Sequence, residues 1–157
     1  MKRENLLKNL MSKLEDDAEL TSASNFSIFV DKELNISKED QGLIRDFLSL
    51  CVESMGIEGD YKCFLSANRK RSHIVTTAIC TFSENRIKIY CHERSLADIL
   101  RSIAHEAFHL RQHELDLVPK KIKKPHHLNP IEWQANVAGG SLLSYFAQKV
   151  GKDKIYR

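Results

Sequence analysis

Two histidines and a glutamate stand close together in the run His105-Glu106-Ala107-Phe108-His109, which fits the pattern H-E-x-x-H inside an apolar helical repeat. Histidines four residues apart on an α-helix are rotated by ~40° and separated by ~6 Å along the axis, so both imidazoles can reach one metal ion. Glu106 then points toward the open side of that ion, where a water would sit. The motif predicts a zinc hydrolase with His105 and His109 as ligands and Glu106 as general base.

The third ligand has to be chosen among several side chains further along the chain. His113 continues the series, but its Cα lies ~12 Å along the axis from that of His105, too far for one ion with Zn–N bonds of ~2.0 Å. We expect His113 at the surface or behind a ligand. His126 and His127 lie in a Pro-flanked loop, which holds a ligand less rigidly than a helix, and both stay open as alternatives.

Glu132 is the favoured third ligand, because it stands on another helical run with Asn136 one turn later. One of these side chains can bind zinc while the other hydrogen-bonds a ligand imidazole. A simple alternative for Glu132 is a carboxylate stabilised by the dipole at a helix N-terminus. We expect one Zn²⁺ per chain.

This ligand set predicts a mechanism for peptide hydrolysis. Zinc with three protein ligands keeps a fourth position for water and lowers the pKa of that water toward ~7. Glu106 would accept the proton as the hydroxide attacks a peptide carbonyl and would then deliver it to the leaving amine. An oxyanion needs a neutral or cationic donor. The candidates are His126, His127, Tyr145 and Tyr90, and we favour a loop histidine.

The surrounding pattern predicts an α+β fold. Helical spacing is expected over residues 2–20, from the cap at Ser37 to Gly56, over 95–112, and from Asn129-Pro130 onward, while 26–30 could be a short strand or a buried turn. Residues 61–67, 73–82 and 86–90 read as strands, and their short connections predict a three-stranded, mostly antiparallel sheet. If 86–90 is a sheet edge, an extended substrate could pair with it. Gly139-Gly140 indicates a close backbone approach or a kink.

The H-E-x-x-H helix, followed by Glu132-x-x-Ala135-Asn136 and by Leu142-Leu143, resembles the ImmA/IrrE family of minigluzincin metallopeptidases. The resemblance covers roughly residues 60–147. It implies a small zincin-like domain in which His105, His109 and Glu132 bind zinc and Glu106 is the base. We expect one metallopeptidase-like domain over 1–157, with a helical N-terminal part (1–58) and a zincin core (60–150).

The composition of the chain predicts its general class and its location in the cell. With 157 residues, 42% apolar and 29% charged, the chain is long enough to bury a core, and no apolar run approaches the ~20 residues of a membrane span. We expect a cytoplasmic protein that does not bind membranes, with its four cysteines as buried or half-buried free thiols. The net charge of +3 is too small to imply nucleic-acid binding by itself. Basic clusters at 68–71 and 120–124 could still contact an acidic partner.

The leading interpretation is a zinc endopeptidase acting on a specific intracellular protein or peptide. One alternative is an SprT-like, DNA-associated protease that uses His126 or His127 as third ligand. Another is a non-catalytic module that binds a regulatory partner in the same pocket. Replacing Glu132 separates the first two, because only the first needs it for zinc. Replacing Glu106 separates either enzyme from the binding module.

Overall fold

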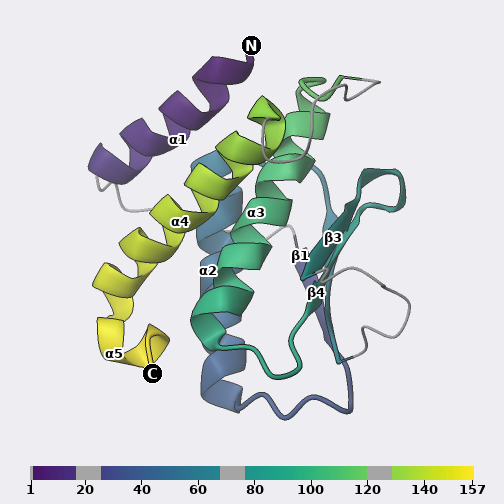
Figure 1. The fold of residues 1–157 in the computed structure, drawn as a ribbon, viewed down its shortest axis with the longest axis vertical. Coiled ribbons are helices and arrows are strands. Elements are labelled where there is room, and N and C mark those ends of the chain that lie inside the picture. Colours follow the sequence, from purple (N-terminus) through teal and green to yellow (C-terminus); the bar gives the residue numbers. More distant parts are fainter. Residues whose placement is uncertain (1, 17–25, 68–76, 120–128) are drawn as a thin grey trace.

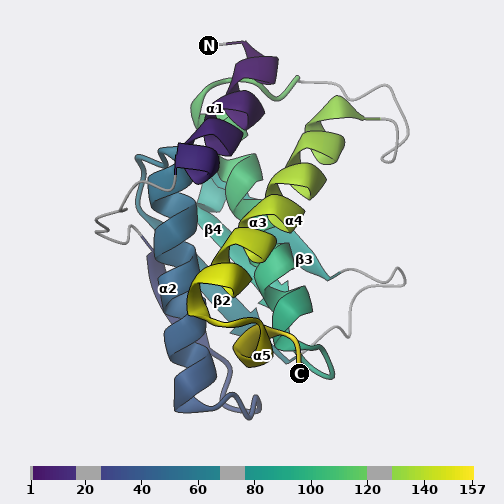
Figure 2. The same cartoon turned by 90° about the vertical axis from the view of Figure 1, so that its left-hand side faces the viewer.

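The computed structural model describes residues 2–16, 26–67, 77–119 and 129–157. A four-stranded sheet carries helices on one of its faces (Figure 1). Helices α2 and α3 pack against the strands, while α1 and α4 form a further layer over them (Figure 2). The elements are α1 (Arg3–Asp16), β1 (Phe26–Val30), α2 (Lys38–Met55), β2 (Tyr61–Ser66), β3 (Ala78–Thr81), a 3-10 turn η1 (Phe82–Glu84), β4 (Arg86–Tyr90), α3 (Leu96–Glu114), α4 (Pro130–Val150) and α5 (Lys152–Ile155).

The expected α+β class is confirmed, but the three-stranded antiparallel meander is wrong. The sheet order is β1-β2-β4-β3, and both the β1–β2 and β2–β4 pairs are parallel. Only β3 and β4 pair antiparallel, because η1 and Asn85 in the left-handed region (φ 53°) reverse the chain within four residues. The connection from β2 to β3 is long enough for β3 to lie beyond β4 in the sheet, so β4 lies between β2 and β3.

The N-terminal part is not purely helical, since residues 26–30 form a strand of this same sheet. Strand β1 pairs with β2, and α2 connects the two, which makes a parallel βαβ unit. The expected N-cap of α2 is confirmed, with the Ser37 hydroxyl accepting from the Asp40 N–H. Gly56 ends the helix with φ 74°, a conformation that glycine adopts without strain.

Strand alternation separates a buried face of the sheet from an open one. Ile87 and Ile89 are fully buried against the helices, while Arg86 and Lys88 point to the other side. All four cysteines are free, and Cys51, Cys63 and Cys91 are buried while Cys80 is half-buried, which confirms that prediction. None of the helices in the described part of the chain is both long and apolar enough to cross a lipid bilayer.

Candidate metal centre

Helices α3 and α4 carry the three predicted ligands. Helix α3 begins at the Ser95 cap, whose hydroxyl accepts from the Asp98 N–H, and it runs without interruption through His105 and His109. Helix α4 begins at Asn129, whose side chain accepts from the Ile131 N–H. Glu132 therefore stands in the first turn of α4 and faces the middle of α3.

Gly139 sets the distance between these two helices. A Cβ built on it would lie 3.1 Å from the Arg101 carbonyl oxygen and 3.6 Å from the His105 nitrogen. Gly140 would meet nothing within 4 Å. The expected close approach is thus a property of Gly139 alone, and α4 continues through both glycines. Since Gly139 lies about two helical turns after Glu132, the same face of α4 meets α3 at both positions.

The three ligand atoms converge on one point. His105 Nε2 lies 2.8 Å from Glu132 Oε2, His109 Nε2 lies 3.1 Å from the same oxygen, and the two Nε2 atoms are 3.0 Å apart. The two imidazole rings are nearly perpendicular, at 82°. Among the described residues, these three are the group of potential ligands that could hold a metal ion together.

The donor set fits zinc. Zinc binds imidazole nitrogen and carboxylate oxygen at about 2.0–2.2 Å, which at the tetrahedral angle separates ligand atoms by about 3.4 Å. The observed separations of 2.8–3.1 Å reach that value through an opening of about 0.3–0.6 Å, within the range of small side-chain rotations. His105, His109 and Glu132 would hold the ion.

Gln112 is a site residue that the sequence interpretation missed. Its amide NH₂ donates to the Ile131 carbonyl at 3.2 Å, which turns its Oε1 toward His109 Nδ1 at 2.7 Å. An amide oxygen only accepts, so Nδ1 carries a proton and Nε2 is the nitrogen left to bind a metal. Gln112 is fully buried, and it joins a ligand on α3 to the backbone of α4 directly before Glu132.

The electrostatics of the cluster favour an ionised Glu132. Burial would raise the pKa of its carboxyl, but hydrogen bonds from His105 and His109, and their charges, outweigh burial and hold that pKa well below its usual range. For His109, burial lowers the pKa, while the hydrogen bond to Glu132 and the nearby Glu106 charge raise it overall. The carboxylates thus create a site that attracts positive charge.

Glu106 and Asn136 have different surroundings. Glu106 is buried on α3 beside the ligands, and its charge acts on His109. Asn136 is exposed on α4, and the described hydrogen bonds of the two imidazoles go to Glu132, Gln112 and each other. The structure places Gln112, rather than Asn136, in contact with a ligand imidazole.

The tyrosine candidates for oxyanion binding lie away from the cluster. Tyr145 is about 20 Å beyond Glu132 along α4, with the Lys149 ammonium 5.5 Å from the centre of its ring. Tyr90 points to the sheet face opposite the helices, where Lys88 covers its ring at 5.8 Å. His126 and His127 lie outside the described residues, as do the basic clusters at 68–71 and 120–124. His113 is exposed, and its ring stacks on Phe82.

Strand β3 borders the cluster from the sheet. It packs against α3, and the charges of Glu106 and Glu132 act on its inward side chain Cys80. Burial first, and then the charges of Glu106 and Glu132, raise the pKa of the Cys80 thiol to about 12. Since β4 is central and β3 is an edge strand, the condition under which a substrate could pair with 86–90 is not met. The edge nearest the cluster is β3.

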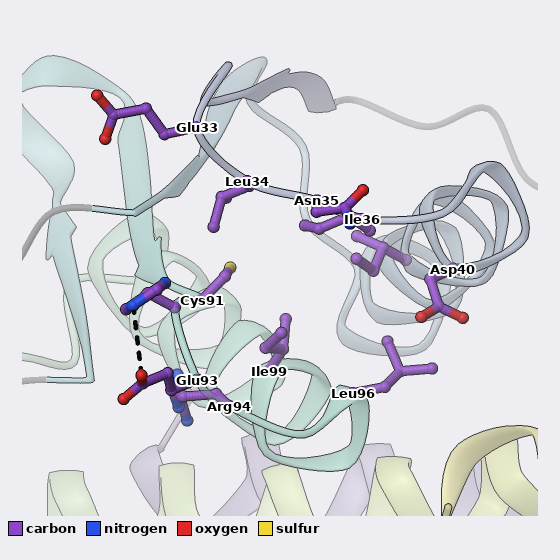
Figure 3. Close-up of a pocket in the computed structure, with 12 residues that line it drawn as sticks. Glu33, Leu34, Asn35, Ile36, Asp40, Cys91, Glu93, Arg94, Leu96 and Ile99 are labelled. Carbon is purple, nitrogen blue, oxygen red and sulfur yellow. Dashed lines mark ion pairs between the residues drawn. The ribbon is translucent and has the colours of Figure 1, made fainter.

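A separate cavity of about 350 Å³ lies at the start of α3 (Figure 3). Its apolar lining includes Leu34, Ile36, Leu96 and Ile99, and none of the predicted ligands belongs to it. Two of the acidic groups in its lining have partners: Asp40 binds Arg157 at 2.8 Å, and Glu93 lies 3.6 Å from His92. The cavity is therefore distinct from the His–His–Glu cluster.

Comparisons of the chain with protein-family models, with curated proteins and with solved structures returned no match.

Proposed function

We propose that this protein is a zinc-dependent metallopeptidase with a zincin-like catalytic domain. The observation that carries the proposal is the convergence of His105, His109 and Glu132 within 2.8–3.1 Å of one another, on two helices whose separation Gly139 sets. The resemblance to the ImmA/IrrE family rests on the motif residues alone, so the proposal is carried by this geometry. Zinc bound there would activate a water and polarise the scissile carbonyl.

Glu106 is the proposed general base. It follows His105 directly on α3, and it is only 7% exposed. Its carboxylate would take a proton from the attacking water and pass it to the leaving amine. A glutamine in its place keeps nearly the same volume but cannot accept that proton.

The substrate is proposed to be an extended protein or peptide segment lying along β3. An edge strand offers unpaired backbone groups to such a segment, which adds to the sheet as a further strand. Because β3 packs against α3, a segment in that position would pass next to the cluster. This replaces β4, which is paired on both sides.

The decisive experiment measures the zinc content of purified wild type and of three variants by mass spectrometry. We expect one zinc per chain in wild type and loss of zinc in His105→Ala and Glu132→Gln. His113→Ala is the matched control, because it removes an exposed imidazole one turn beyond His109 on the same helix, and it should keep the zinc. Full occupancy in Glu132→Gln would refute this ligand set and favour a loop histidine.

A second measurement separates catalysis from binding alone. Glu106→Gln should retain zinc but cleave a mixed library of peptides at least about 100-fold more slowly than wild type, consistent with the loss of general base catalysis. Equal cleavage by wild type and Glu106→Gln would rule out the assigned base. Zinc binding in a wild-type protein that captures peptides without cleaving them would favour the non-catalytic module.

A further inference from the structure

The face of the sheet opposite the helices carries aromatic and cationic side chains. Along β1, β2 and β4 the outward positions include Phe29 and Phe64 together with Lys62, Arg86 and Lys88. Phe29 is 45% exposed, which is unusual for a large apolar side chain in a strand. No helix covers this face in the described part of the chain (Figure 1).

Three of these side chains form a stack that runs across the strands. The Phe29 and Phe64 rings are nearly parallel, at 18°, with centroids 5.0 Å apart. The Arg86 guanidinium lies over the Phe64 ring at 5.9 Å. Phe64 therefore lies between a guanidinium and a ring. The stack ends at Phe29 on the edge strand β1, where a further planar group could add to it.

The cations of this face outnumber the acidic side chains near it by three to two. Lys62 is exposed, and Arg86 and Lys88 are half-buried. Two acidic side chains lie near: Glu84 pairs with Arg86 at 2.7 Å, and Asp31 accepts hydrogen bonds from two backbone N–H groups. These hydrogen bonds first, and the charge of Lys88 after them, lower the pKa of Asp31 and favour its ionised form. Lys62 is the cation closest to the stack in sequence, two residues before Phe64.

We propose that this open sheet face binds single-stranded nucleic acid. A base would stack on the exposed ring of Phe29 and extend the row, while Lys62 and Lys88 would contact backbone phosphates. Unpaired bases offer the flat faces that such a stack accepts, and every base has one, so binding would depend little on sequence. The positive charge favours a polyanion over a neutral aromatic peptide. This surface lies on the other side of the sheet from the His–His–Glu cluster, and the proposal does not depend on zinc.

The test is fluorescence anisotropy of labelled 12-nucleotide dT and U strands with the full chain. We expect saturable binding of either strand, weaker binding of a duplex, and affinity about tenfold lower for Phe29→Ser, in line with the loss of one base–aromatic stack. Phe29→Trp preserves an aromatic surface and should bind at least as tightly as wild type. Because it keeps a large apolar side chain in the strand, it also guards against a folding defect in the serine variant.

Charge is tested with a matched pair of lysines. Lys62→Ser should lower the slope of log affinity against log salt by about 0.7, the value for one single-strand phosphate contact. Lys154→Ser removes the same charge from exposed α5 and should leave the slope unchanged. The proposal is overturned by absent binding, by equal effects of the two lysine changes, or by equal affinity of wild type and Phe29→Ser. Sedimentation showing that Phe29→Ser dissolves a dimer would also overturn it, since the face would then bind a second copy.

Discussion

Adding one methyl group at each of the adjacent glycines of α4 should have opposite effects on stability. Alanine in a helix interior is more favourable than glycine by up to ~1 kcal/mol. Gly140→Ala meets nothing within 4 Å, so this gain should appear in full, as a rise in melting temperature of ~2–4 °C for a chain of this size. At Gly139 the new Cβ would lie 3.1 Å from the backbone oxygen of Arg101, which cannot rotate away.

The helices must then separate at Gly139 by a few tenths of an ångström. Overpacking of this kind costs ~1–3 kcal/mol, which outweighs the helix-propensity gain and leaves Gly139→Ala ~0–2 kcal/mol less stable than wild type. The same movement shifts Glu132 relative to His105 and His109, so zinc affinity should change in Gly139→Ala and stay unchanged in Gly140→Ala. Urea unfolding in the presence of a chelator measures the first effect, and competition with a chromophoric chelator measures the second. Equal stabilisation of both variants with equal zinc affinity would refute the role assigned to Gly139.

Three further outcomes test the network around the site. Gln112→Leu should weaken zinc binding by about 10–100-fold, the usual effect of losing a partner that orients a ligand; quenching of the sole tryptophan, Trp133, by Co²⁺ reports this, and unchanged affinity would contradict the orienting role. Zinc at 100 times its Kd should stabilise wild type by ~2.7 kcal/mol and leave Glu132→Gln unaffected in calorimetry. Burial raises the pKa of Glu114, but hydrogen bonds from Tyr61, Gly59, Glu58 and Arg111 lower it overall. The contribution of the Glu114 carboxylate to the free energy of unfolding is therefore present above pH ~4 and disappears as the pH falls through the lowered pKa. Glu114→Gln should therefore lower stability at pH 7, and this loss should shrink as the pH falls through the lowered pKa of Glu114, whereas a loss independent of pH would show that its charge is not involved.

Local sequence patterns predicted the helices well, because the residues that start and end a helix lie within a few positions of its boundary. The caps at Ser37 and Asn129 and the left-handed end at Gly56 are short-range chemistry. The histidine pair is equally local, since helix geometry alone brings i and i+4 together. Glu132 required a guess about two helices meeting, and its support in the sequence was Asn136 one turn later, which the structure shows to be exposed.

The order of the strands and the role of Gln112 could not be predicted from such local sequence patterns. Alternation assigns the two faces of β4, but it does not say which strand lies beside it, because pairing depends on long-range contacts. Gln112 is polar and lies three residues after His109 in a largely apolar helix. That position is compatible with exposure as well as with burial, and only the packing of α4 shows that the amide has two partners.

The two proposed sites lie on opposite sides of the sheet, the nucleic-acid surface on β1, β2 and β4 and the His–His–Glu cluster on the helix side, next to β3. In the antiparallel β3–β4 pair, Thr81 lies opposite Arg86 and Cys80 lies opposite Ile87. Arg86, which belongs to the stack, is therefore one position away from the partner of Cys80, which lies near the cluster. Phe29 lies two strands further away, on β1. Phe29→Ser should therefore leave zinc content unchanged, and Glu132→Gln should leave nucleic-acid affinity unchanged. Strand β4 contacts both β3 and α3, so a coupling between the two sites should appear first in variants of Arg86 rather than of Phe29.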